Sequence, residues 1–407
     1  MNRRQFIKHT TVLGLAGVNG SLPGKAAEKS SGCRVQLDVI SEGYDGKSCW
    51  FHPRAGAIPG RSPTVVLTMQ RWLLAHSDVF EPIHSMDTAD LGRKWSQPVE
   101  HAGTLGRRSE PGGVEVGMCD FTPKWHARTK TLLGIGHTVR YLNNKLIASH
   151  PRETAWSVYD PTLKTWTRWQ VLEMPKAEKF WNAGAGSAQR VDPRNGDILL
   201  PIYFKAEASK AYSATVARCA FDGNKLRYLE HGSELTVAVD RGLYEPSLAS
   251  FRGHYFLTLR NDRAAHVATS PDGLRFTPPR LWTWDDGSDL GSYNTQAHWV
   301  THEAALFLVY TRRNANNDNV VRHRAPLFMA QVDVERLVVL RDTERELVPN
   351  KGAQLGNFGV VDVNEHETWV TTSEGMGRAG AEKYGANGRV YAARLLWDRP
   401  NSAWNRH

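Results

Sequence analysis

Cysteine is scarce in this sequence, with only 4 among 407 residues. None of the four stands in a Cys-x-x-Cys pair, so a cysteine-based zinc site is not expected. Four cysteines allow three disulfide pairings in an oxidising compartment, and buried free thiols are the alternative. We expect neither a metal nor a cofactor. The four residues are Cys33, Cys49, Cys119 and Cys219.

Long apolar runs and blocks of one charge are also missing. The apolar run from Thr11 to Val18 is too short to span a bilayer, and no later stretch is long enough, so no transmembrane helix is expected. The formal net charge is +9, but the basic residues form no Lys/Arg block and no recognisable nucleic-acid motif. The charge therefore favours an acidic carbohydrate as partner over nucleic acid.

The N-terminus reads MNRRQFIKHTTVLGLAGVNG, in which Arg3 and Arg4 precede a mildly apolar run. Such a segment is typical of targeting and not of folded structure. It resembles the twin-arginine export signal, which implies that the folded chain is exported to the periplasm or the cell exterior. We predict that residues 1–31 are this signal and a linker, and that residues 32–407 form a single domain. A basic cytosolic N-terminus is the alternative.

Sustained helical periodicity is rare after residue 32. Short β-rich runs such as PTVVLTM, GDILLPIYF and HYFLTLR alternate with turns rich in Gly, Pro, Asn and Asp. This pattern predicts an all-β protein of many short strands. At this chain length it favours a propeller, whose four-stranded blades close into a ring and leave only short exposed edges.

One turn pattern recurs in the chain: TADLGRKW at residues 88–95, SPDGLRF at residues 270–276 and, more weakly, YDPTLKTW at residues 159–166. In such turns Asp accepts backbone N–H groups, Gly takes a positive φ and the aromatic ring packs on the blade. They resemble the Asp-box turns of the sialidase superfamily, which lie away from the active site. The resemblance implies a six-bladed β-propeller, although the chain length also allows seven blades. We therefore assign no chemistry to Asp90 or Asp272.

The segments before the first of these turns, FHPRAGAIPG and QRWLLAHSDVFEPIHSMD, resemble the start of a sialidase. By position, Arg54 matches the first arginine of the family's carboxylate-binding triad, and Asp78 matches the general acid. Sialidases place that arginine directly before Ile-Pro, whereas Arg54 stands several residues before Ile58-Pro59. Arg71 is therefore a second candidate, and a structural cap is the alternative for Asp78.

A second segment, LYEPSLASFRGHYFLTLR, places Glu245 and Arg260 at the distant ends of two predicted strands joined by a turn. In the family this glutamate activates a tyrosine nucleophile and this arginine binds the substrate carboxylate. The third triad arginine lies near the start of a strand like PLFMAQVD, where Arg322 and Arg324 are the candidates. Guanidinium groups suit a planar carboxylate because they bind it with two parallel hydrogen bonds. The alternatives are a buried Glu–Arg ion pair and a solvated basic loop.

The last segment, LGNFGVVDVNEHETWVTTSE, resembles the family's final blade, and Glu374 matches the glutamate that orients the first arginine. The family's nucleophilic tyrosine has no counterpart, because Asn357 and Phe358 occupy its neighbourhood. Another tyrosine such as Tyr293 or Tyr310 replaces it, or the chemistry differs.

Three functions follow from these residues. The first is hydrolysis of a glycan at an acidic sugar bound by Arg54, Arg260 and Arg322, with Asp78 as acid/base and Glu245 as the polarising base or the base for water. The second is β-elimination at a uronic acid with His298 or Tyr293 as base. The third is a glycan-binding propeller without catalysis.

Overall fold

The computed structural model describes residues 32–404, so the predicted export signal at residues 1–31 lies outside the described residues. The regular structure of the described chain is mostly β-strand, which confirms the predicted all-β class. Its single α-helix is α1 (Ala102–Leu105), and no helix in residues 32–404 is long and apolar enough to cross a membrane. The four cysteines are free thiols.

The strands form six antiparallel sheets. The first contains β2 (Ser48–Ile58), β3 (Thr64–Leu73), β4 (Phe80–Thr88) and β5 (Val99–Glu100). The second contains β6 (Arg108–Glu110), β7 (Val114–His126), β8 (Thr131–Leu142), β9 (Lys145–Leu146), β10 (Thr154–Asp160), β11 (Thr165–Trp166) and β12 (Gln170–Val171). The third contains β13 (Asn182–Gly184), β14 (Asp197–Lys205), β15 (Ser213–Phe221) and β16 (Leu226–His231).

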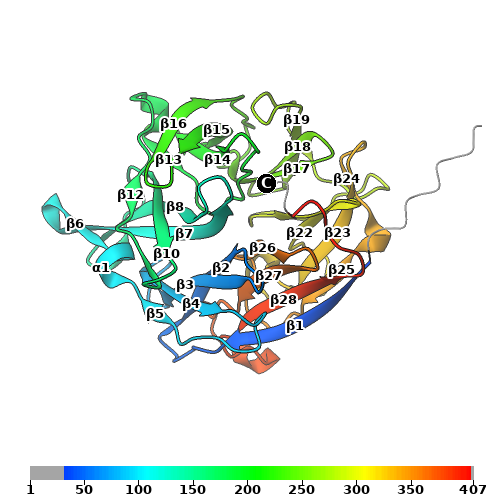
Figure 1. The fold of residues 1–407 in the computed structure, drawn as a ribbon, viewed down its shortest axis with the longest axis horizontal. Helices are drawn as coiled ribbons and strands as arrows, with labels where there is room; N and C mark the ends of the chain where they lie inside the picture. Colours follow the sequence, from blue (N-terminus) through cyan, green and yellow to red (C-terminus); the bar gives the residue numbers. More distant parts are fainter. Residues whose placement is uncertain (1–31, 405–407) are drawn as a thin grey trace, which may run out of the picture. The chain divides into compact units, whose positions relative to one another are not determined.

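The fourth sheet contains β17 (Tyr244–Phe251), β18 (His254–Arg260), β19 (His266–Ser270) and β20 (Arg280–Leu281). The fifth contains β21 (His298–His302), β22 (Ala305–Tyr310), β23 (Leu327–Asp333), β24 (Val338–Val339) and β25 (Arg345–Val348). The sixth contains β26 (Gly359–Asn364), β27 (Glu367–Ser373), β28 (Val390–Trp397) and β1 (Cys33–Ser41). The sheets stand in a ring around a central axis, which is the arrangement of a β-propeller (Figure 1).

The ring is closed by the two ends of the described chain. Strand β1 pairs antiparallel with β28, from Cys33 opposite Trp397 to Ser41 opposite Val390. The sixth sheet therefore combines the first described strand with the last three. Such a closure leaves no open gap between the beginning and the end of the ring.

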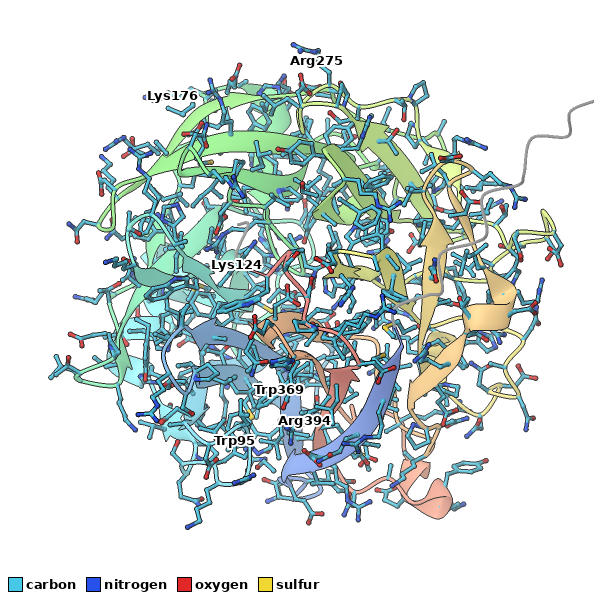
Figure 2. The ribbon with its side chains drawn as sticks, turned by 45° about the vertical axis from the view of Figure 1, so that its right-hand side comes forward. Trp95, Lys124, Lys176, Arg275, Trp369 and Arg394 are labelled. Atoms are coloured by element: carbon cyan, nitrogen blue, oxygen red, sulfur yellow. The ribbon has the colours of Figure 1, made fainter. Side chains whose placement is uncertain are left out.

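A cavity of about 210 Å³ occupies the axis, and residues on or next to all six inner strands line it. Figure 2 shows Lys124, one of the lining residues, near the middle of the ring. The lining residues include Ala57, Lys124, Gln189, Leu248, Trp299 and Val361. In β2, β7, β17 and the segment that leads into β21, the residues that line the cavity come after the residues described below as the candidate site. The site therefore occupies the end of the axis at which the inner strands begin.

Two of the three recurring turns, at residues 88–95 and 270–276, have the geometry predicted for them. Asp90 Oδ1 accepts the backbone N–H of Lys94 at 2.9 Å, and Asp272 Oδ1 accepts the N–H of Arg275 at 2.8 Å. Gly92 and Gly273 both have φ near 80° (78° and 79°). The turns follow β4, β10 and β19, the third main strands of their sheets, and so lie at the outside of the ring, where Trp95 packs against Trp369 (Figure 2).

Candidate functional site

Five non-glycine residues with positive φ lie on or next to inner strands near one end of the axis: His52 on β2, Asp120 on β7, Glu245 on β17, Ser187 after β13 and Asn294 before β21. The φ values are 53° for His52, 54° for Asp120, 57° for Ser187, 44° for Glu245 and 50° for Asn294. Those of β2, β7 and β17 lie at breaks in strand register. Bulges re-aim side chains, and residues in this conformation are strained, so both features are typical of functional sites. Here they bring polar groups from different sheets together.

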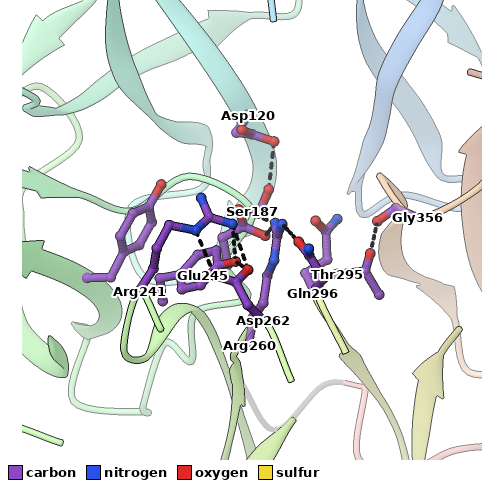
Figure 3. Close-up of polar contacts among 12 residues, drawn as sticks. Asp120, Ser187, Arg241, Glu245, Arg260, Asp262, Thr295, Gln296 and Gly356 are labelled. Carbon is purple, nitrogen blue, oxygen red and sulfur yellow. Dashed lines mark hydrogen bonds and ion pairs between the residues drawn. The ribbon is translucent and has the colours of Figure 1, made fainter. Parts of the chain in front are cut away.

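Asp120 is the centre of the first group of contacts, and Figure 3 shows its contact with Ser187. Its Oδ1 accepts hydrogen bonds from Arg54 Nη2 at 2.8 Å and from Ser187 Oγ at 2.6 Å. His52 Nε2 lies 3.3 Å from the same oxygen, and His137 Nε2 lies 3.7 Å from Oδ2. Burial alone would raise the pKa of Asp120, but the two histidines and the Arg54 guanidinium hold that pKa well below its usual range. Asp120 is therefore a permanent anion with a side chain 13% exposed.

Both histidines beside Asp120 are uncharged at neutral pH. Burial lowers the pKa of His52 to about 4, and burial with the neighbouring Arg152 lowers the pKa of His137 well below its usual range. A second line of contacts leads away from His137: its Nδ1 lies 3.3 Å from Tyr203 Oη, which accepts a hydrogen bond from Arg152 Nη1 at 2.7 Å. The site thus contains a neutral imidazole and a phenol in contact.

Glu245 and Arg260 form the second group, as the sequence predicted from their places at two strand ends. Arg260 Nη1 donates to Glu245 Oε1 at 2.6 Å and to Oε2 at 2.5 Å, and its Nη2 donates to Asn294 Oδ1 at 2.7 Å. The guanidinium also lies over the Tyr244 ring, with its carbon 4.6 Å from the ring centre. The predicted alternative of a Glu–Arg ion pair is therefore present, within the candidate site (Figure 3).

Arg324 stands beside Arg260 without a carboxylate of its own. Its Nη2 and Nε donate to the Asn294 carbonyl at 2.6 and 3.2 Å, and its Nη1 donates to Gln354 Oε1 at 3.3 Å. Burial and the nearby positive charge of Arg260 lower the pKa of Arg324 to about 9. Within residues 32–404, no salt bridge joins this guanidinium to an acidic group. It is a buried cation surrounded by neutral acceptors.

The sequence offered two candidates for each of two triad arginines, and the structure shows which candidate of each pair is buried. Arg54 is buried against Asp120, whereas Arg71 bonds the Gly43 carbonyl and lies over the Trp50 ring. Arg324 is 5% exposed and turned inward, whereas Arg322 is exposed. Arg322 has φ of 55° within a 3₁₀ turn, which sends its side chain outward two residues before Arg324.

Asp78 lies at the margin of the first group. It is exposed with φ of 54°, and Ser77 Oγ donates to its Oδ2 at 2.9 Å. Burial is the main reason for the lowered pKa of His52, and Asp78 is among the charges that oppose this effect. It is therefore close enough to act electrostatically on the buried cluster.

The other predicted site residues have partners outside these two groups. Tyr293 Oη lies 2.6 Å from His323 Nδ1, and His298 Nδ1 lies 2.7 Å from Ser247 Oγ. Glu374 accepts hydrogen bonds from Tyr391 Oη at 2.7 Å and from two backbone N–H groups. The carboxylate that contacts Arg54 is therefore that of Asp120, and not that of Glu374 as the resemblance implied.

Phe358 lies in the segment where the resemblance implies a nucleophilic tyrosine. The side chain is fully buried and packs edge-on against His298, with ring centres 4.9 Å apart. Its side chain has no hydroxyl group that could act as a nucleophile.

The prediction from sequence did not include Asp120, His137, Arg152, Ser187 or Tyr203. One signal for Asp120 was visible, since it is an acidic residue within the mostly apolar stretch GMCDF of an inner strand. His52, Cys119 and Asp120 also offer ligand atoms within 4.8 Å of one another. Arg54 already binds that carboxylate, and its charge would oppose a metal ion, so this donor set does not fit one.

No protein-family model and no curated protein matches this sequence. Solved structures with similar folds include a Hadza microbial sialidase, at 13% identity and a TM-score of 0.62, covering 88% of this chain and 68% of that one. A protein of unknown function from Dyadobacter fermentans has 16% identity and a TM-score of 0.62, with 90% and 99% covered. A Trypanosoma rangeli sialidase has 13% identity and a TM-score of 0.56, with 91% of this chain covered; this chain spans 60% of that protein.

These similarities and the ring of sheets establish the fold as a β-propeller of the sialidase type. At identities of 11–16% they establish the fold alone.

Proposed function

We propose that this protein is a sialidase-like glycoside hydrolase that acts on an acidic sugar of a glycan or polysaccharide. The observation that carries the proposal is Arg324, a buried guanidinium with neutral partners and a pKa lowered to about 9. A bound carboxylate would supply the missing negative charge. Arg54 (Nε and Nη1) and Arg260 (Nε) add buried nitrogens without hydrogen-bond partners.

In this proposal Arg54, Arg260 and Arg324 bind the sugar carboxylate. Asp78, which has a solvent-exposed side chain, protonates the leaving oxygen, and Glu245 acts as the base of the reaction. We further propose six blades, one for each antiparallel sheet, and export to the periplasm or the cell exterior through the twin-arginine-like N-terminus.

The test compares the parent protein with Arg324→Met and Arg322→Met on a panel of sialylated glycans and uronate-containing polysaccharides. Reducing-sugar release reports hydrolysis. Loss of a charge-assisted contact worth about 1.5–3 kcal/mol should lower kcat/KM of Arg324→Met roughly 10- to 100-fold. Arg322→Met, a matched change at an exposed arginine, should stay within about threefold. Equal losses in both variants would contradict the assignment of Arg324.

A second function, β-elimination at a uronic acid, is favoured by the contact between Tyr203 and His137 beside Arg152. This pair takes over the basic role that the sequence had given to His298 or Tyr293. A rise in ultraviolet absorbance from an unsaturated product would establish elimination and exclude hydrolysis. If the parent binds a glycan and converts none, and Asp78→Asn and Glu245→Gln bind equally well, the protein is a glycan-binding propeller.

A further inference from the structure

We infer that Tyr203 is the nucleophile of the proposed hydrolase, with His137 in place of Glu245 as the base and Asp120 as the group that orients this base. The inference rests on the proposed function. It assigns the role of nucleophile, which Phe358 cannot fill because it has no hydroxyl. It is carried by a continuous line of contacts from Arg152 through Tyr203 and His137 to Asp120.

The chemistry of these groups fixes the direction of proton transfer. Arg152 can only donate, so its 2.7 Å contact uses Tyr203 Oη as an acceptor and leaves the phenol hydrogen for His137 Nδ1, 3.3 Å away. His137 Nδ1 must then be the accepting nitrogen, and Nε2 carries the imidazole hydrogen. That nitrogen faces Asp120 Oδ2 at 3.7 Å. A nucleophile, a base within reach and a carboxylate behind the base are the parts of a catalytic triad.

The fold brings Tyr203 to the right end of the axis. Strand β14 runs antiparallel to the inner strand β13, with Tyr203 opposite Gly184, so the end of β14 reaches the same face as Asp120 and Ser187. Burial raises the pKa of Tyr203 well above its usual range, Arg152 opposes this, and Glu245 and Asp120 add to it. The phenol therefore lies within electrostatic reach of both site carboxylates and needs a base to lose its proton.

Tyr203 is 2% exposed, whereas the side chains of Asp120 and Glu245 are each 13% exposed. In this inference the sugar reaches the phenol oxygen from the side of these two more exposed carboxylates. Arg152, which already donates to that oxygen, stabilises the negative charge that develops on it during the reaction.

The reaction balances in two steps. In the first, Tyr203 Oη bonds to the anomeric carbon, its proton moves to His137 Nδ1, and the bond to the aglycone oxygen breaks with its electron pair on that oxygen, which takes the proton of the Asp78 carboxyl. In the second, water bonds to the anomeric carbon and gives a proton to Asp78. As this bond forms, the bond between the anomeric carbon and Tyr203 breaks with its electron pair on Oη, and the phenolate recovers its proton from His137. The anomeric configuration is retained.

The first experiment tests the proton relay, defined as the contacts from Tyr203 through His137 to Asp120, without any substrate. The parent protein, with ¹⁵N-labelled histidine, is examined by long-range ¹H–¹⁵N correlation near neutral pH, and His137 is identified by its loss in His137→Gln. We expect Nε2 to be protonated and Nδ1 to be a hydrogen-bonded acceptor whose shift moves in Tyr203→Phe. A proton on Nδ1 would overturn the relay whatever the protein's activity.

The second experiment measures turnover of a nitrophenyl glycoside of the acidic sugar by the parent, Tyr203→Phe and Tyr228→Phe. Tyr228 is a matched control because its hydroxyl also contacts a histidine, His231 Nδ1 at 2.6 Å, on β16 of the same sheet. Loss of a nucleophile should lower kcat roughly 1000-fold or more, while Tyr228→Phe stays within about threefold.

The stereochemistry of the product separates the inference from the proposed function. Two results together support the inference. The proton NMR spectrum of the first-formed sugar shows that the anomeric configuration is retained, and a 2,3-difluoro analogue of the acidic sugar becomes attached to the peptide that contains Tyr203. Inversion, or attachment to another residue, leaves the hydrolase standing and overturns Tyr203 as nucleophile. Absence of turnover on the whole panel overturns the proposed function and the nucleophilic role together.

Discussion

Two histidines near the axis are held neutral by their surroundings, and this makes stability depend on pH. Burial lowers the pKa of His52 to about 4, and burial with the charge of Arg54 lowers the pKa of His298 to about 3. Unfolding returns both to a pKa near 6.5, so below that pH the unfolded chain binds more protons. The free energy of unfolding should therefore fall as pH drops from about 6.5 towards 4, by roughly 1.4 kcal/mol per pH unit for each histidine.

Urea unfolding at several pH values checks this with His298→Asn, whose amide can still meet Ser247 Oγ. The variant should lose stability less steeply than the parent between pH 6.5 and 4. His254→Asn removes an exposed histidine and should keep the parent's slope. An unchanged slope in His298→Asn would show that His298 is protonated in the folded protein.

At the same scale, the sequence predicted the residues that meet through local structure. Glu245 and Arg260 lie on neighbouring strands joined by a short turn, so their contact followed from the hairpin pattern. Arg324 could not be separated from Arg322, because only the backbone of the intervening turn decides which side chain points inward. Tyr203 and Asp120 come from different sheets, and no pattern in one segment indicates such a contact.

The elements that build the site are inner strands interrupted where they approach the axis. His52, Asp120 and Glu245 each have positive φ at a break in strand register. None of the three is glycine, the residue type that indicates a positive φ in a sequence. The strands themselves were therefore predictable from composition, whereas the bends that aim their polar side chains at one another were not.

The turns at the outer end of the sheets should matter for stability alone. Asp272→Ala removes the acceptor for the backbone N–H groups of Leu274 and Arg275, at 3.0 and 2.8 Å, in the turn after β19. We expect the free energy of unfolding to fall by about 1–2 kcal/mol, because backbone donors lose their partner. Denaturant unfolding measures this, and kcat/KM should equal that of the parent. Asp318→Ala, at a fully exposed carboxylate, should change neither value, and a loss of activity in Asp272→Ala without loss of stability would place this turn in the site.

For the whole molecule, short strands and recurrent turns predicted a ring of sheets, but nothing in them indicated how the ring closes. Strands β1 and β28 lie at opposite ends of the described chain and pair within one sheet. The packing across this closure adds to its hydrogen bonds, since Cys33 and Val35 rest on the buried cluster around Trp397. Arg394 also reaches Asp38 at 3.2 Å from the neighbouring strand.

A chain that begins at Glu42 lacks β1 and tests the closure directly. It leaves the backbone of β28 exposed along an edge that pairs residues 33–41 in the full protein, and such edges promote association between chains. We expect the melting temperature to fall by roughly 5 °C or more, with oligomers in size-exclusion chromatography. A chain that begins at Gly32 keeps β1 and should melt like the parent. Adding a peptide of residues 32–42 to the shortened chain should restore both properties, because the ring needs the strand and not its covalent link. A shortened chain that stays monomeric with an unchanged melting temperature would show that the other strands of the sixth sheet close the ring without β1.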